Sequence, residues 1–178
     1  MLKSALVFSM LFAILGAVVV FGYYATFRRP VTTVIIVRHA EKIIDPNNPD
    51  VDLSEAGYAR AKEIAREFGD AGIQAIYATQ YKRTQETVKP LADKTGTPVT
   101  IVNSKSTSDL LAQIRSQHSG QTIFIAGHNN TVPEIVEALG GPKYPTIPES
   151  EYDNLFVVTV YRTGKAKVVK MKYGAASQ

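Results

Sequence analysis

Short apolar runs rich in β-branched residues alternate along this chain with segments of helical periodicity, and this alternation constrains the fold most. The sequence predicts strands over residues 32–37, 73–78, 98–102 and 122–126, and helices over residues 55–68, 81–94, 109–118 and 131–139. Ser54 is the predicted N-cap of the first of these helices, and Ser108 or Asp109 that of the third. A final hairpin is expected from strands at residues 155–161 and 165–173. Strands that alternate with helices predict an α/β fold, a three-layer α/β/α sandwich with a mostly parallel central sheet.

The segment before this pattern is different, because residues 4–27 carry no charge. A helix of this length would span about 36 Å, which exceeds the hydrocarbon core of a bilayer at about 30 Å. The run is also longer than the apolar part of a cleavable signal peptide, and no Ala-x-Ala site ends it. The sequence therefore predicts a single-pass membrane anchor in residues 1–29, with a folded domain in residues 30–178. A cleaved signal is the alternative.

Composition excludes several classes of function. The chain has no cysteine, which excludes disulfide scaffolds, cysteine-ligated metals and thiol catalysis. The net charge is +4, a mild excess, and the bases are not gathered into one long run. Lys165, Lys167, Lys170 and Lys172 fit a solvated edge strand, where lysine discourages pairing between sheets. No nucleic-acid partner is expected.

Basic residues cluster at the predicted carboxyl ends of the strands, where ligands bind in open α/β sheets. Arg38 and His39 directly follow the first strand, and His128 directly follows the fourth. Arg83 lies just past the second strand, in the first turn of a helix. Guanidinium groups bind phosphate oxygens in pairs, and a helix N-terminus adds free N–H groups. The pattern predicts a pocket that binds anions, although either arginine taken alone would more simply form a surface ion pair.

Four segments containing these residues resemble the motifs of the histidine phosphatase superfamily, also called phosphoglycerate-mutase-like. Arg38-His39-Ala40-Glu41 is similar to its RHGE signature, in the RHAEK form of small members. The other three follow in the family's order, and they are Leu53-Ser54-Glu55-Ala56-Gly57, TQYKRTQET at residues 79–87, and Gly127-His128-Asn129-Asn130-Thr131. The resemblance extends from about residue 32 to 173.

This resemblance implies that His39 is the nucleophile and forms a phosphohistidine that water then hydrolyses. Arg38, Arg83 and His128 would hold the phosphoryl oxygens, and Asn130 would add a side-chain N–H. A neutral imidazole can attack phosphorus while positive donors offset the charge on the equatorial oxygens. The reaction needs no metal or organic cofactor. The expected substrate is a small phosphomonoester or a phosphoprotein, including protein phosphohistidine.

The group that protonates the leaving oxygen is left open among three carboxylates near the motifs. Glu41 lies two residues beyond His39, Asp52 lies in the loop before the first helix of the domain, and Glu134 lies six residues beyond His128. We favour Glu41 because it is nearest to the nucleophile in the chain.

Two other functions remain open: a phosphoglycerate-type mutase, and a phosphate-binding module with weak or no turnover. Specificity is expected to come from the loops at residues 43–52 and 141–152. Small RHAEK members commonly carry export signals, so the resemblance implies an extracytoplasmic, periplasmic domain, with secretion after signal cleavage as the alternative. The loop sequences do not name a physiological substrate.

Overall fold

The computed structural model describes the whole chain except residues 1, 28–30, 162–163 and 178; the side chains of residues 2–9 and 25–27 are also outside the description. Its contacts divide the chain into two units, Met1–Pro30 and Val31–Gln178. The first unit is helix α1 (Leu2–Phe27). Within the part of the chain that is described, no helix combines the length and the hydropathy of a membrane span. The predicted boundary between residues 29 and 30 lies outside the described residues.

The second unit is built on one mixed sheet, whose described strands have the order β3-β2-β4-β1-β5-β6. Parallel pairing joins β3, β2, β4 and β1, as predicted. β6 pairs antiparallel with β5, because the short connection between these two strands permits only that direction. β5 also pairs antiparallel with β1. The strands are β1 (Thr32–Arg38), β2 (Ile73–Thr79), β3 (Val99–Val102), β4 (Thr122–Gly127), β5 (Asn154–Val160) and β6 (Ala166–Lys172).

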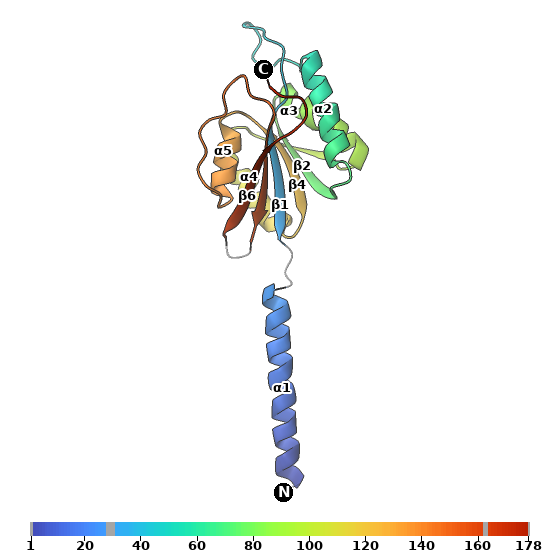
Figure 1. The fold of residues 1–178 in the computed structure, drawn as a ribbon, viewed down its shortest axis with the longest axis vertical. Coiled ribbons are helices and arrows are strands. Elements are labelled where there is room, and N and C mark those ends of the chain that lie inside the picture. The colour runs from blue at the N-terminus through green and yellow to red at the C-terminus, as the bar shows by residue number, and fades with distance from the viewer. Residues whose placement is uncertain (1, 28–30, 162–163, 178) are drawn as a thin grey trace. The chain divides into compact units, whose positions relative to one another are not determined.

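Helices cover both faces of this sheet (Figure 1), which gives the α/β sandwich. α2 (Glu55–Phe68) and α3 (Lys82–Thr95) pack on one face, around buried Ile64, Leu91 and Phe124. α4 (Thr107–Gln117) and α5 (Thr131–Ala138) pack on the other face, around Leu110, Val136 and Phe156. The central strands β1, β2 and β4 therefore present buried apolar side chains to both layers, which explains their nearly continuous apolar sequence.

The start of α2 is fixed against the segment that follows β1. Ser54 is the N-cap, as predicted, and its hydroxyl accepts a hydrogen bond from the Gly57 backbone N–H at 3.2 Å. The Ser54 backbone N–H donates to the Glu41 carbonyl at 2.9 Å. A Cβ atom on Gly57 would lie 2.0 Å from the same carbonyl oxygen, so only glycine permits this close approach. The Leu-Ser-x-x-Gly sequence thus positions the backbone just beyond His39.

Candidate active site

The two histidines lie side by side because the strands that precede them are parallel neighbours. Arg38 of β1 is paired with Gly127 of β4, and the His39 backbone N–H donates to the Gly127 carbonyl at 2.8 Å. The ring centroids of His39 and His128 are 5.5 Å apart, at an interplanar angle of 65°. Both residues are buried, with exposed fractions of 3% and 8%. The structure therefore brings together the two histidines that the sequence places at separate strand ends.

The imidazole of His39 is held in one tautomer by the backbone carbonyl of the next residue. Its Nδ1 lies 2.8 Å from the carbonyl oxygen of Ala40, which can only accept a hydrogen bond. Nδ1 therefore carries the proton, and Nε2 keeps its lone pair. The Ala40 backbone N–H donates to the hydroxyl of Thr87 on α3 at 2.9 Å, which fixes this peptide in place. This is the arrangement that a nucleophilic imidazole requires.

His128 is held by the segment that carries Arg83. Its Nε2 lies 3.0 Å from the Thr79 hydroxyl, which is 2.9 Å from the Thr84 hydroxyl. The Thr84 hydroxyl also donates to the Tyr81 carbonyl at 2.8 Å, at the start of α3. The edge of the Tyr81 ring contacts His128, with centroids 5.4 Å apart. The threonines of the TQYKRTQET segment thus join β2, α3 and the second histidine.

The guanidinium of Arg38 is buried, with an exposed fraction of 1%, and it is bound by the loop before β5. Its Nη1 donates to the carbonyls of Pro148, Glu149 and Glu151 at 2.9, 2.8 and 3.1 Å. Its Nη2 donates to the carboxylate of Glu149. Its central carbon lies 4.2 Å from the ring centroid of Tyr152. Among the nitrogens of this guanidinium, Nε is the one without a hydrogen-bond partner among the described residues.

Arg83 approaches the same region from the first turn of α3. Its Nη1 donates to the Pro49 carbonyl at 3.0 Å, and its guanidinium lies 4.3 Å from the ring centroid of Tyr81. The Nε atoms of Arg38 and Arg83 are both buried and have no hydrogen-bond partner among the described residues. A buried charged donor without a partner is costly, and an anion would satisfy both.

Burial and positive charge keep both imidazoles neutral. Burial lowers the pKa of His39 to about 3, and the hydrogen bond to Ala40 opposes this shift while Arg38, Arg83 and His128 reinforce it. Burial likewise lowers the pKa of His128 to about 4, with further contributions from Arg83 and Arg38. Burial also lowers the pKa of the Arg83 guanidinium. At neutral pH the positive charge of the site therefore comes from the arginines, and His39 is available as a nucleophile.

These lowered pKa values predict that acid destabilises the fold. Below the ordinary histidine pKa of about 6.5, the unfolded chain binds protons that His39 and His128 do not bind in the folded protein. The free energy of unfolding should fall by about 2 kcal/mol for each of these histidines between neutral pH and about pH 5. Urea unfolding followed by circular dichroism measures this, and His39→Gln should remove one of the two contributions. A free energy independent of pH over this range would contradict the burial of neutral rings.

Glu41, the favoured proton donor, lies in an ion pair with Arg60 of α2. Both of its carboxylate oxygens accept hydrogen bonds from Arg60 Nε, at 3.0 and 2.9 Å, and one also accepts from Nη2 at 2.7 Å. Arg60 is itself buried and donates to the Tyr173 carbonyl at 3.2 Å. This geometry fits a residue that joins the β1–α2 segment to the C-terminal end of the domain. The role of Glu41 in proton transfer stays a prediction.

Asn130, predicted to bind substrate, has an exposed side chain, and its backbone N–H donates to the Asn129 side-chain oxygen at 3.0 Å. The neighbouring Asn129 is the residue that contacts the site, because its side-chain N–H₂ donates to the Glu149 carboxylate at 2.7 Å. The role of Asn130 in substrate binding stays a prediction. Glu134, the third carboxylate considered, is exposed in the first turn of α5.

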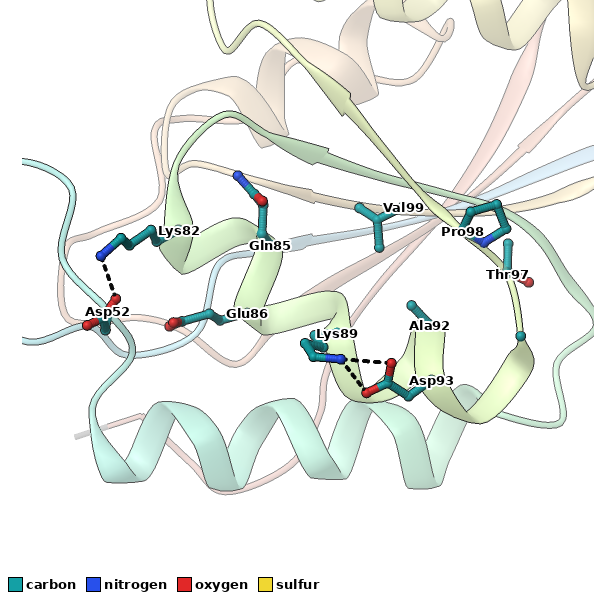
Figure 2. Close-up of a pocket in the computed structure, with 11 residues that line it drawn as sticks. Asp52, Lys82, Gln85, Glu86, Lys89, Ala92, Asp93, Thr97, Pro98 and Val99 are labelled. Atoms are coloured by element: carbon teal, nitrogen blue, oxygen red, sulfur yellow. Dashed lines mark hydrogen bonds and ion pairs between the residues drawn. The ribbon is translucent and has the colours of Figure 1, made fainter.

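Asp52 belongs to a different hollow, of about 790 Å³, beside α3 and the start of β3 (Figure 2). There it forms an ion pair with Lys82 at 3.2 Å. Further along the same hollow Lys89 pairs with Asp93 at 2.7 Å. The residues that line it include none of the predicted phosphate-binding residues. This hollow is therefore separate from the candidate active site.

A larger groove has a volume of about 1140 Å³. It is lined by Glu41, by the exposed face of α2 and residues 174–177, and by Glu149 and Tyr152. The Tyr152 ring lies 6.0 Å from the His39 ring, between centroids, so the lining of the groove comes near the histidines at this residue. Sequence reasoning assigned the loop at residues 141–152 to specificity but missed Glu149 and Tyr152. No local pattern marks them, because they contact Arg38 across more than a hundred residues of sequence.

Known proteins resemble this chain in part of its sequence and in its fold. The model of the histidine phosphatase superfamily (branch 1) matches residues 34–104, which include Arg38, His39 and Arg83. No curated protein sequence matches the chain. The protein histidine phosphatase SixA, solved with tungstate, has a TM-score of 0.65 at 16% identity, over 79% of this chain and 96% of that one. The chain has a histidine phosphatase fold.

Two further solved structures share this histidine phosphatase fold. A mycobacterial glucosyl-3-phosphoglycerate phosphatase has a TM-score of 0.63 at 13% identity, over 82% of this chain and all of that one. A phosphoserine phosphatase from Entamoeba histolytica, solved with 3-phosphoglyceric acid, has a TM-score of 0.61 at 16% identity, over 81% and 98%. His128 and the loop that binds Arg38 lie outside the residues that the family model matches, so their place in the site rests on the geometry alone.

Proposed function

We propose that this protein is a histidine phosphatase that hydrolyses phosphomonoesters, or protein phosphohistidine, through a covalent phosphohistidine on His39. The observation that carries the proposal is the unprotonated Nε2 of His39, fixed by the Ala40 carbonyl in a site with two arginines whose Nε atoms are buried and have no partner among the described residues. A nucleophile and unused positive donors in one buried site fit phosphoryl transfer, where catalysis depends on positioning and on stabilising charge. The family model and the shared fold support the same assignment.

In this mechanism the phosphoryl group lies between the guanidiniums and His39. Nε2 of His39 attacks phosphorus, and the bond from phosphorus to the ester oxygen breaks. Arg38 and Arg83 donate through Nε to the phosphoryl oxygens, and His128 adds a further donor if its free nitrogen carries the proton. A water then attacks the phosphohistidine, releases inorganic phosphate and restores the neutral imidazole of His39.

A substrate panel on the full-length protein in detergent tests this proposal. The panel contains p-nitrophenyl phosphate, sugar phosphates, nucleotides, phosphoserine and a phosphohistidine protein. We expect phosphate release with a burst equal to the enzyme concentration, and a labelled enzyme whose phosphate is labile to acid and stable to base. Phosphate transfer between positions of a phosphoglycerate would indicate a mutase. Binding of inorganic phosphate without any turnover would indicate a binding module and would contradict the proposal.

The size of the groove bears on the class of substrate. Its volume of about 1140 Å³ is above the usual range of small-molecule pockets, about 300–1000 Å³. Both a small leaving group and a protein segment that carries phosphohistidine can therefore be accommodated. The solved structures of similar fold include a protein histidine phosphatase and phosphatases of small phosphorylated metabolites, so both classes belong in the panel.

We further propose that residues 1–29 attach the domain to a membrane, with the domain on the extracytoplasmic side. The uncharged run at residues 4–27 and the exposed apolar side chains of α1, among them Phe12 and Phe21, support this proposal. Deletion of residues 1–29 should release the protein from the membrane fraction and leave its turnover of p-nitrophenyl phosphate unchanged. Fractionation and N-terminal sequencing measure this. A full-length gene product found mature near residue 30 in the soluble fraction would indicate a cleaved signal.

A further inference from the structure

We propose that Glu149 is the general acid and base of this phosphatase reaction, an inference that rests on the proposed role of His39 as nucleophile. Glu149 lies in the loop between α5 and β5, far in sequence from both histidine motifs. Three observations carry the assignment: the partners of its carboxylate, its place beside the groove, and the engagement of the neighbouring carboxylates elsewhere.

The carboxylate of Glu149 spans the two segments that carry the histidines. One of its oxygens accepts a hydrogen bond from Arg38 Nη2, and the other accepts from Asn129 Nδ2 at 2.7 Å. Arg38 directly precedes His39, and Asn129 directly follows His128. A phosphoryl group bound at the two histidines would therefore have the Glu149 carboxylate as a neighbour.

Glu149 also lies where the leaving group must pass. It lines the 1140 Å³ groove together with Tyr152, whose ring lies 4.2 Å from the central carbon of the Arg38 guanidinium and 6.0 Å from the His39 ring, measured to the ring centroids. A substrate with its phosphate on His39 and its remaining part in the groove has its ester oxygen at the junction of the two. Glu149 contacts Arg38 on the phosphate side and also lines the groove. Its side chain is 74% exposed, so it can exchange protons with water.

The nearby carboxylates have other partners. Glu41 pairs with Arg60, which is not one of the predicted phosphate-binding residues. Glu151 accepts from Asn154 at 2.8 Å and from Lys172 at 3.0 Å. Among the described residues, Glu149 is thus the carboxylate that pairs with a phosphate-binding arginine.

The proton transfers balance over the two steps. Glu149 enters the first step in its protonated form, with a proton that comes from water. As Nε2 of His39 bonds to phosphorus, the ester oxygen takes the proton from Glu149 and leaves as an alcohol. The Glu149 carboxylate then accepts a proton from the water that attacks the phosphohistidine, so phosphate is released and Glu149 is again protonated.

Glu149→Gln tests this assignment, because it removes the proton and keeps the shape of the side chain. The variant should lower kcat about 10²-fold for an alkyl phosphate and less than about threefold for p-nitrophenyl phosphate, whose leaving group needs no proton. Across a series of aryl and alkyl phosphates, its rate should depend more steeply on the leaving-group pKa than the wild-type rate does. Asp93→Asn is the matched control, since its carboxylate pairs with Lys89 in the separate hollow beside α3, and it should show wild-type rates on both substrates.

The other outcomes overturn the assignment. Equal losses on both substrates would make Glu149 a residue that only positions Arg38. Equal gains, with tighter inhibition by vanadate, would make it an anion that competes with phosphate for Arg38. Failure of the proposed function itself is distinguishable, because the wild-type protein would then release no phosphate from p-nitrophenyl phosphate.

Discussion

Replacing His39 with alanine should lower turnover of every substrate by on the order of 10⁴-fold or more, because the reaction loses its covalent nucleophile. The labelled phosphoenzyme should disappear from the same variant. The reason is local: Nε2 of His39 carries a lone pair because the Ala40 carbonyl holds the proton on Nδ1. Single-turnover assays and acid-quenched labelling measure the two effects together.

His118 supplies the control for this experiment. It lies beyond the end of α4, where its ring contacts the Tyr77 hydroxyl at 2.8 Å and the Gln121 side chain at 2.6 Å. His118→Gln should therefore retain both turnover and labelling. His39→Gln, compared by circular dichroism with the wild type, separates a chemical loss from a folding loss. Full activity in both His39 variants would remove this residue from the mechanism.

Replacing Arg83 with alanine should lower kcat/KM by about 10²–10³-fold, because a charged donor is lost where negative charge develops. Arg83→Lys should recover only part of the activity, since an ammonium cannot place N–H groups as a guanidinium does. The structure supports a role beyond a surface ion pair. The Nε of Arg83 is buried without a described partner, and the guanidinium is held by the Pro49 carbonyl and the Tyr81 ring.

Lys82 is the matched control for Arg83, as the preceding cation on the same helix. It pairs with Asp52 in the hollow beside α3 (Figure 2) and contacts none of the predicted phosphate-binding residues. Lys82→Ala should change kcat/KM by less than about threefold, as expected for loss of an exposed ion pair. Equal effects of Lys82→Ala and Arg83→Ala would show a general effect of positive charge. Arg83 would then be interpreted as a member of a surface ion pair.

The parts of the site that could be predicted from sequence are those next to strands. Arg38, His39 and His128 follow apolar strands, and parallel pairing brings the ends of β1 and β4 together without any further information. Thr87 was identified only as a member of a motif. The structure supplies its physical role, because its hydroxyl accepts the Ala40 backbone N–H and donates to the Arg83 carbonyl at 2.6 Å.

The parts that could not be predicted depend on contacts distant in sequence. Glu149 and Tyr152 come to Arg38 from a proline-rich loop that has no periodicity. Helix α4 begins at Thr107 rather than at Asp109, since the Ser106 carbonyl already accepts from the Asp109 and Leu110 backbone N–H groups at 3.1 and 3.2 Å. The preference of serine and aspartate for the N-cap predicted a cap at residue 108 or 109, but the backbone hydrogen bonds of the packed helix determine where α4 begins.

The way Arg38 binds its loop bears on how such a protein can diverge. Three of its hydrogen bonds go to main-chain carbonyls, of Pro148, Glu149 and Glu151, and every amino acid offers the same carbonyl. Side chains in this loop other than Glu149 and Tyr152, which themselves contact Arg38, can therefore change without loss of the bonds that hold its backbone beside the phosphate-binding arginine. Selection can alter which molecules enter the groove while the apparatus for phosphoryl transfer stays intact, so new specificities are accessible by substitution alone, without insertion or deletion.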